Sequence, residues 1–225
     1  GEACRKFDTR VTGGNVSFYN QNPDGPVYPT PTIGMVGLVE DPAKKMTLNF
    51  KAEGDVLFVI GAMQNDIACS EYLHKIVGVE KSPAPHFDLE EEFALQQKVS
   101  ELIKAGVIQS AHDISEGGLF VTLCESGFSN NLGFDIKTEN TFRKDAYLFG
   151  EAQSRVVVSV SAEKVAAFKS VLTNFTATEI GTVNAGEITI DGEAWGNITD
   201  WKVKYDTAIE KMLAKEESAG ALGML

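Results

Sequence analysis

Residues 110–119 read SAHDISEGGL, a pattern typical of a strand end, a tight polar loop and a helix start. The short apolar segment 107–111 predicts a strand, and the polar residues after it predict a tight loop. Ser115 is the expected N-cap of a helix that ends at Gly127. The apolar residues of that helix recur at helical spacing: Leu119, Phe120, Leu123 and Cys124. A strand, a loop and a helix in direct succession are typical of α/β domains.

The segments on either side continue this alternation of strands and helices. Strands are expected at residues 56–60, 132–136, 156–160, 177–183 and 187–190, the last two as a hairpin-like pair around 184–186. Helices are expected at residues 70–77, 88–106, 162–172 and 206–215, and the second has an apolar stripe of Leu89, Phe93, Leu102 and Ile103. Residues 53–225 are therefore predicted to form an α/β (α+β) domain. We expect a two-layer mixed sheet with helices, in which the strand at 56–60 is buried on both faces.

Residues 1–52 show strands and loops rich in glycine and proline instead of an α/β alternation. This pattern predicts the end of a domain whose start is missing. Strands are expected at 15–20 and 33–39, with a loop rich in proline and glycine between them. The chain begins without Met, and residues 2–7 are typical of the last turns of a helix. We therefore expect the sequence to be a piece of a longer protein.

Composition narrows the classes of partner. The chain has 225 residues and a formal net charge of -12, which argues against nucleic acid and anionic membranes as partners because both attract basic surfaces. The three cysteines are widely spaced, without a CxxC pair, and predict reduced thiols rather than a disulfide framework or a zinc site. No apolar run approaches the length of a membrane span. A cytoplasmic location is expected.

The stretch VTGGNVSFYN, residues 11–20, is the first candidate site. Two glycines allow the backbone to approach a ligand closely. Because side chains alternate along a strand, Asn15 and Ser17 are expected on one face. The Asn15 amide oxygen suits Mg²⁺, and the Ser17 hydroxyl suits phosphate oxygens or a polar substrate. The alternative is a turn that caps a strand.

The stretch at 110–119 is the second candidate site. Backbone N–H groups of residues 116–118 at the expected helix start could bind an anion or a phosphate, and Asp113 could hold a metal there. Alternatively, Asp113 and Ser115 only cap the helix and favour its dipole. His112 invites an acid/base interpretation, but a single His without a visible partner is more often structural.

The third candidate is FGEAQSR, residues 149–155, directly before the strand at 156–160. Its polar residues could bind a ligand. Equally, Glu151 and Arg155 could pair at i,i+4 spacing and close the end of the sheet. The pattern alone leaves both interpretations open.

Four motifs stand out along the chain, at residues 12–20, 29–37, 110–119 and 149–155. Their sequences and their order resemble the carboxy-terminal part of the phosphoribosylformylglycinamidine synthase family, the PurL synthetase subunits. That resemblance implies conversion of formylglycinamide ribonucleotide, ATP and ammonia from glutamine into formylglycinamidine ribonucleotide, ADP and phosphate, with Mg²⁺ required. It also implies a tandem duplication, each half like aminoimidazole ribonucleotide synthetase. Residues 1–52 would be the end of the second β-rich, ATP-binding domain, and residues 53–225 the second α/β domain.

The resemblance also implies roles for individual residues. Gly14 matches a backbone contact to ATP, Asn15 a Mg²⁺ ligand and Ser17 a contact to the ribonucleotide substrate. Asp113 and Ser115 match an auxiliary nucleotide and metal site of the long single-chain relatives. The residues that perform the chemistry in the family lie in the first half of the subunit and are absent from this sequence, so no catalytic residue is expected here.

Two departures from the family pattern are visible. Arg10 stands where the family usually has Pro, and Ala68–Cys69 stand where Gly-Gly is expected before Ser70. The second departure weakens any phosphate-binding role for that turn.

The implied partners are the missing first half of the same subunit, together with a glutaminase subunit and a small accessory subunit in the short form of the enzyme. Two alternatives remain. The piece could be a non-catalytic nucleotide-binding or scaffold module, inert in isolation. It could also belong to another member of the superfamily, such as a selenophosphate synthetase or a hydrogenase-maturation protein, although the run at 12–17 argues against this.

Overall fold

The computed structural model describes residues 1–14, 21–26 and 32–214. The chain divides into two compact units, Gly1–Lys45 and Met46–Leu225, called unit 1 and unit 2 below. Each is described by itself. None of the helices described in either unit is long and apolar enough to cross a membrane.

Unit 1 contains little regular structure. Its described residues form one short helix, two paired two-residue strands and a 3-10 turn: α1 (Glu2–Lys6), β1 (Gln21–Asn22), β2 (Gly25–Pro26) and η1 (Pro42–Lys44). None of its described residues is buried. Its contribution to a hydrophobic core within the described chain is therefore negligible.

The prediction of a strand at residues 33–39 is wrong. That segment pairs with no other strand of the described chain, and Ile33 and Val36 are 84% and 99% exposed. A strand needs a neighbour that takes up its backbone N–H and C=O groups, and β propensity alone does not supply one. The strand predicted at 15–20 lies outside the described residues.

Unit 2 is built on a seven-stranded mixed sheet with the order β4-β6-β3-β7-β5-β8-β9. The strands are β3 (Val56–Ile60), β4 (Ser110–Asp113), β5 (Gly133–Ile136), β6 (Val156–Val160), β7 (Ala177–Asn184), β8 (Glu187–Ile190) and β9 (Glu193–Asn197). Neighbouring strands run antiparallel except β5 and β8, which are parallel.

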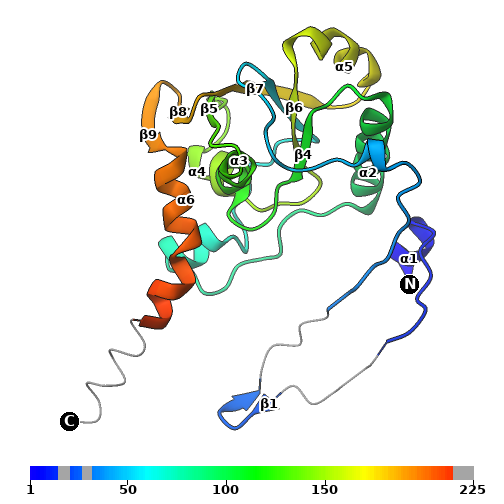
Figure 1. Ribbon diagram of the computed structural model, residues 1–225. Helices are drawn as coiled ribbons and strands as arrows, with labels where there is room; N and C mark the ends of the chain where they lie inside the picture. The colour runs from blue at the N-terminus through cyan, green and yellow to red at the C-terminus, as the bar shows by residue number, and fades with distance from the viewer. Residues whose placement is uncertain (15–20, 27–31, 215–225) are drawn as a thin grey trace. The chain divides into compact units, whose positions relative to one another are not determined.

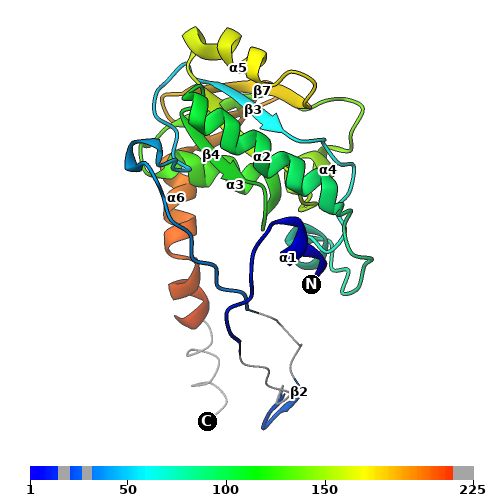
Figure 2. The same cartoon turned by 90° about the vertical axis from the view of Figure 1, so that its right-hand side faces the viewer.

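Helices cover both faces of this sheet (Figure 1). Alternate residues of β3 show the division, because Leu57 and Val59 join one apolar cluster while Phe58 and Ile60 join the other. The first cluster includes residues of α3 (Gly118–Phe128), α4 (Lys144–Phe149) and α6 (Ile198–Asp206). The second includes residues of α2 (Leu89–Ala105) and α5 (Val165–Val171), which lie on the face seen in Figure 2.

The mixed α/β class is therefore confirmed, and so is the burial of β3 on both faces. The expected two layers are corrected to three, since helices pack on each side of the sheet. The pattern of β3 is consistent with this, because a strand that is apolar at consecutive positions has to be covered on both sides.

Helix α2 forms as its sequence predicts. The Asp88 carboxylate accepts hydrogen bonds from the backbone N–H groups of Glu90 and Glu91, and Gly106 ends the helix with a φ of 65°. Leu102 is fully buried, as predicted, and Phe93 is half-buried. Leu95 is also buried, although the predicted stripe left it out.

Helix α3 begins later than predicted. Gly117 and Gly118 have φ values of 81° and 69°, so a turn closed by a hydrogen bond from Gly118 N to the Ser115 carbonyl precedes the helix. Ser115 is consequently not the N-cap, which is Gly117. The preceding strand β4 occupies 110–113 rather than 107–111.

Strands β7 and β8 do not form the predicted hairpin. β5 lies between them and pairs with both, antiparallel to β7 and parallel to β8. The close spacing of β7 and β8 in sequence suggested direct pairing, but a strand from earlier in the chain takes the place between them. β9 and α6 were not predicted, and the helix expected at 206–215 corresponds to the end of α6 and a helical stretch at 208–214.

Two shorter helices complete unit 2. They are η2 (Tyr72–Ile76), a π-helical turn inside the helix predicted at 70–77, and η3 (Ala162–Lys164), which opens the helix predicted at 162–172. The strands predicted at 132–136 and 156–160 are present as β5 and β6.

Candidate functional site

A polar pocket of about 380 Å³ lies in unit 2 where the second and third sequence motifs meet. Its lining residues come from the loop between β4 and α3, from the segment before β6, and from α2: Asp113, Ile114, Ser115, Glu116, Glu151, Gln153, Ser154, Arg155, Val156, Glu92 and Leu95. Antiparallel pairing of Asp113 with Val156 brings the two motifs together. The name polar pocket is used for this cavity below.

Asp113 and Ser115, both predicted as site residues, lie at this pocket. Each is exposed, and Asp113 is the last residue of β4. Carboxylates predominate in the lining, namely Glu92, Asp113, Glu116 and Glu151, against one basic side chain, Arg155. An anion that enters the pocket therefore encounters a negative field.

Glu151 fills the position where an anion was predicted to bind. Its Oε1 accepts a hydrogen bond from Gly117 N at 2.9 Å and another from Glu71 N at 2.8 Å. The N–H of Gly118 donates to the Ser115 carbonyl at 3.0 Å. Two of the three N–H groups that were predicted to face a ligand are thus used within the chain. The start of α3 binds a carboxylate, as helix starts do, but the carboxylate is the protein's own.

Arg155 closes the end of the sheet without pairing with Glu151. Its guanidinium is buried and donates to backbone carbonyls, from Nη2 to Gly150 O at 2.8 Å and from Nε and Nη2 to Ala152 O at 3.1 and 2.9 Å. Burial lowers the pKa of Arg155 to about 10, and the nearby charge of Asp66 opposes that shift. The predicted i,i+4 pair is therefore wrong, although the predicted structural role of Arg155 is present.

Ser154 is held in an uncommon backbone conformation beside the pocket. Its φ is 62°, and its hydroxyl donates to Glu92 Oε2 at 2.8 Å. Gly61, at the end of β3, has to be glycine here, because a Cβ atom would lie 2.1 Å from the Ser154 carbonyl oxygen. These contacts fix the segment that forms one wall of the pocket.

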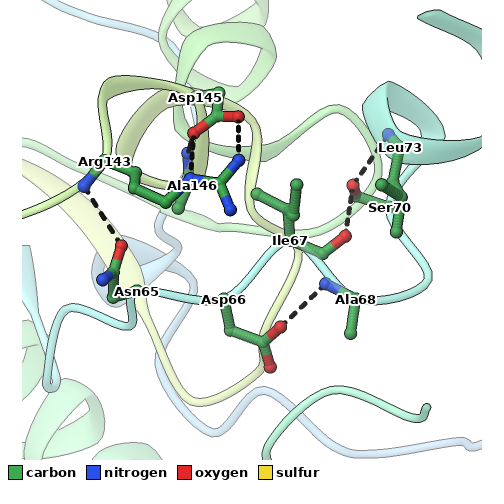
Figure 3. A network of polar contacts seen from close by, with 9 residues as sticks. All are labelled: Asn65, Asp66, Ile67, Ala68, Ser70, Leu73, Arg143, Asp145 and Ala146. Atoms are coloured by element: carbon green, nitrogen blue, oxygen red, sulfur yellow. Dashed lines mark hydrogen bonds and ion pairs between the residues drawn. The ribbon is translucent and has the colours of Figure 1, made fainter. Parts of the chain in front are cut away.

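A network of polar contacts fixes the loop that follows β3 (Figure 3). Asn65 Oδ1 accepts from Arg143 N at 3.1 Å, and Asp66 Oδ1 accepts from Ala68 N at 2.7 Å. The Ser70 hydroxyl donates to the Ile67 carbonyl at 2.7 Å and accepts from Leu73 N at 3.1 Å. The next residue, Glu71, is thereby placed where its N–H meets Glu151.

The turn at Ala68–Cys69, where the resemblance led us to expect Gly-Gly, has an uncommon backbone conformation. Cys69 has a φ of 54°, in the left-handed region that favours glycine. The Cys69 N–H donates to Ser82 Oγ at 2.7 Å. A family glycine at this place would adopt the same conformation without steric cost.

His112 does not line the polar pocket. Its Nδ1 lies 3.2 Å from the Thr122 carbonyl and 3.1 Å from Ser126 Oγ, and its Nε2 lies 3.5 Å from Glu125 Oε2. These partners belong to α3, so the ring joins β4 to that helix. The geometry favours the structural interpretation of His112 over an acid/base role.

The first motif is only partly described. Gly14 is exposed in unit 1, and no atom lies within 4 Å of the place where a Cβ would stand. Asn15 and Ser17 lie outside the described residues. In the part of the chain that the structure describes, no three His, Cys, Asp or Glu side chains come close enough together to hold a metal ion.

Sequence reasoning missed Glu92 and Leu95 as pocket residues. Both belong to α2, and Glu92 reaches the pocket through its hydrogen bond to Ser154. Their sequence pattern is that of an ordinary amphipathic helix. Only the packing of α2 on the sheet brings them to the site, and no local signal predicts that contact.

A three-layer α/β domain with a preformed polar pocket beside the start of a helix is a common type of ligand-binding domain. Residues 52–192 match the family described as AIR synthase related protein, C-terminal domain, and the chain belongs to that family. The matched residues lie within unit 2.

Relatives with known names extend this result. The chain is 42% identical over 189 residues to phosphoribosylformylglycinamidine synthase subunit PurL of Alkaliphilus metalliredigens, and 45% identical over 161 residues to that of Moorella thermoacetica. These matches cover 83% and 72% of this chain but only 26% and 22% of the relatives. The chain thus spans about a quarter of the length of the curated relatives that it matches. They confirm the resemblance predicted from the four motifs.

Solved structures with a similar fold come from the same kind of protein. PurL of T. maritima complexed with FGAR has a TM-score of 0.60 at 16% identity, covering 70% of this chain and 29% of that one. Its complex with ATP has a TM-score of 0.55 at 15% identity, covering 70% and 27%. The PurLQS structure from Thermotoga maritima has a TM-score of 0.51 at 16% identity, covering 66% and 25%. At these identities the likeness shows the fold alone.

Proposed function

We propose that this chain is the carboxy-terminal part of an ATP- and Mg²⁺-dependent ligase of purine biosynthesis. The whole enzyme converts formylglycinamide ribonucleotide and ammonia from glutamine into formylglycinamidine ribonucleotide, with ATP cleaved to ADP and phosphate. The observation that carries this proposal is the 42% identity over 83% of the chain to proteins named phosphoribosylformylglycinamidine synthase subunit PurL. The isolated chain is inert, because the residues that perform the chemistry lie in the part of the subunit that this sequence lacks.

The domain assignment belongs to the same proposal. Residues 1–52 are the end of a second β-rich, ATP-binding domain, and residues 53–225 are the second α/β domain. The absence of buried residues in the described part of unit 1 supports this assignment, because a segment of a domain cannot complete a core by itself. Exposed apolar side chains such as Val36 acquire their cover in the longer protein.

Ligand roles are assigned to few residues. Gly14 contacts ATP, Asn15 is a Mg²⁺ ligand and Ser17 contacts the ribonucleotide in the whole enzyme. Mg²⁺ there neutralises charge on the phosphoryl group. No chemical step is assigned to a residue of unit 2.

Asp113 and Ser115 belong to an auxiliary nucleotide and metal site in this proposal. Both residues line the polar pocket, which supports the assignment. The geometry also sets a condition, since a phosphate at the start of α3 has to displace Glu151 from Gly117 N. Because the other lining charges are carboxylates, a phosphate needs an accompanying cation in this pocket.

The proposed partners follow from the same comparison. They are the missing part of the subunit, a glutaminase subunit, a small accessory subunit and the small-molecule substrate, with neither nucleic acid nor membrane involved, and the location is the cytoplasm. The name PurLQS of one structure with this fold supports an assembly of several subunits. The net charge of -12 agrees with the exclusion of nucleic acid.

A non-catalytic nucleotide-binding module is the second candidate function. It is favoured by one observation: the polar pocket is formed entirely by residues of unit 2 and so is complete without the missing part of the subunit.

One experiment separates the two candidates. ADP release that depends on formylglycinamide ribonucleotide and ammonia is measured for the chain alone and for the chain joined to the missing part of a PurL subunit. We expect activity only in the joined protein. Calorimetry of the isolated chain with ATP and Mg²⁺ is the second measurement, and binding without turnover would support the module. Substrate-dependent ADP release by the isolated chain would contradict its proposed inactivity.

A further inference from the structure

A second cavity in unit 2, of about 230 Å³, lies on the other side of the 153–154 segment from the polar pocket. Leu95, Gln153 and Ser154 line both cavities and separate them. Three primary carboxamides belong to its lining, those of Gln64, Gln153 and Asn174. The name amide pocket is used for this cavity below.

Gln64 is half-buried and Gln153 and Asn174 are exposed, so that a ligand can reach these side chains. Within the described residues none of them has a hydrogen-bond partner on its side chain, whereas most polar side chains around them are paired. Each primary carboxamide offers two donors and an acceptor on one planar group. A planar ligand group that carries a hydrogen-bond donor beside an acceptor can therefore pair with such a carboxamide through two hydrogen bonds.

The walls that carry these amides are fixed. Gly61 N donates to the Thr176 carbonyl at 3.0 Å, and Phe175 N donates to the Leu172 carbonyl at 2.7 Å. The loop that contains Gln64 is held by the polar network of Figure 3, through the neighbouring Asn65. The cavity is therefore formed before any ligand binds, which lowers the entropic cost of binding.

The remaining lining specifies the kind of ligand. Ala94, Leu95 and Phe175 provide apolar surface, including one aromatic face for a flat ring. Glu91 is the only charged lining residue, and it is acidic. Together with the net charge of -12, it disfavours carboxylates and phosphates. The volume suffices for one ring system rather than for a whole nucleotide.

We propose that the amide pocket binds an uncharged planar group that carries a hydrogen-bond donor beside an acceptor, such as a primary carboxamide on an aromatic ring. Pairing between carboxamides supplies the recognition, as it does when Asn or Gln side chains read the donor and acceptor edge of adenine. The site adjoins the polar pocket, with which it shares Gln153, and it does not require the ligase function.

Nicotinamide and nicotinate are the matched probes, because they share a ring and differ only in carboxamide against carboxylate. Each is titrated into the ¹⁵N-labelled 225-residue chain, and the side-chain NH₂ resonances of Gln64, Gln153 and Asn174 are followed by NMR. Nicotinamide is expected to shift them with a dissociation constant of about 1 mM, as suits a fragment of this size. Nicotinate is expected to bind at least about tenfold more weakly, since it offers no donor and carries a negative charge.

Variants assign the binding to the pocket. Asn174→Gly removes an amide while keeping the left-handed backbone, where Asn174 has a φ of 61°. It is expected to weaken nicotinamide binding about fivefold, the value of one hydrogen bond. Gln64→Leu, which keeps the shape of the side chain, is expected to do the same. Gln97→Leu, on the exposed part of α2, is the control and should change nothing.

Three results would each overturn the proposal. They are amide resonances that nicotinamide leaves unmoved, equal affinity for the two probes, and unchanged affinity in both pocket variants. The ¹⁵N spectra report at the same time whether each variant is folded.

Discussion

The carboxylate of Glu151 connects two backbone N–H groups that are far apart in sequence, those of Glu71 and Gly117. Glu151→Ala leaves both donors without this acceptor and should lower the free energy of unfolding by about 2 kcal/mol. Glu151→Gln keeps an amide oxygen in the same place and should cost about half as much. Urea unfolding at neutral pH measures both changes.

Glu116→Ala is the matched control, since Glu116 is an exposed carboxylate of the same pocket, in the loop that precedes α3. It should have little effect on stability. If Glu151→Ala were as mild as Glu116→Ala, the bridge between the loop and α3 would not contribute to stability.

Tyr147 is fully buried, and its hydroxyl has no hydrogen-bond partner among the described residues. Burial raises the pKa of Tyr147 to about 12, and the charges of Glu139 and Asp191 add to this. An unfolded tyrosine has a pKa of about 10. The folded state therefore retains a proton that the unfolded state loses, so the contribution of Tyr147 to stability is complete below pH 10 and declines between about pH 10 and 12.

Tyr147→Phe should abolish this decline and should not reduce stability at neutral pH, because no hydrogen bond is lost. The difference in unfolding free energy between the variant and the parent chain, measured in urea at increasing pH, should grow above pH 10 in favour of the variant. Tyr72→Phe is the control and should follow the parent chain. A difference that stays constant with pH would refute the buried-phenol explanation.

What sequence could predict about single residues depends on the distance to their partners. Asp88 was predicted correctly as a cap because its partners, Glu90 and Glu91, follow it directly. The partners of Glu151 were not predicted, since a pair with Arg155 at i,i+4 spacing resembles a local contact while the actual partner Glu71 lies on another loop. Asp113 and Ser115 both line the polar pocket because one loop contains both, and their ligand roles stay predictions.

The start of α3 depends on glycine. Gly118 has a φ of 69°, and a Cβ atom there would lie 2.7 Å from the Cα of Phe149 in α4. Because those atoms are backbone, they cannot move aside. Gly118→Ala should therefore destabilise unit 2 by about 4 kcal/mol or prevent folding.

Gly54→Ala separates the backbone cost from the steric cost. Gly54 has a φ of 84°, but a Cβ there would meet no atom within 4 Å. Its substitution should cost about 1 kcal/mol, the ordinary cost of a left-handed conformation. Thermal unfolding of the two variants compares them directly. Equal losses would mean that the contact with α4 is unimportant.

Elements with strong local patterns were predicted well, and pairings between strands were not. β3 and β6 match their expected ranges because each is a continuous apolar run between turn signals. β9 was missed because its sequence, EAWGN, has little apolar alternation and two of its residues disfavour strands. The prediction that β7 and β8 pair was wrong because a sequence pattern indicates which segments are strands but not which strands are neighbours in the sheet.

Unit 2 contains the whole described core, since the buried apolar residues begin at Phe50. A chain that starts at Met46 should therefore unfold in urea with the same free energy as the 225-residue chain, within about 0.5 kcal/mol. Equilibrium unfolding followed by circular dichroism tests this. A loss of more than about 2 kcal/mol would mean that residues 1–45 stabilise the sheet.

The position of β5 has a consequence for synthesis. β5 is made before β7 and β8, yet it is paired on both edges only when those two strands have been added. Until then Phe134 and Ile136, both fully buried in the finished sheet, remain uncovered on the nascent chain. Local helices such as α2 and α3 can form within microseconds, whereas this pairing has to wait for distant residues and for closure of a long loop. β5 thus emerges from the ribosome well before either of its neighbours, and it is a place where a chaperone would be expected to bind.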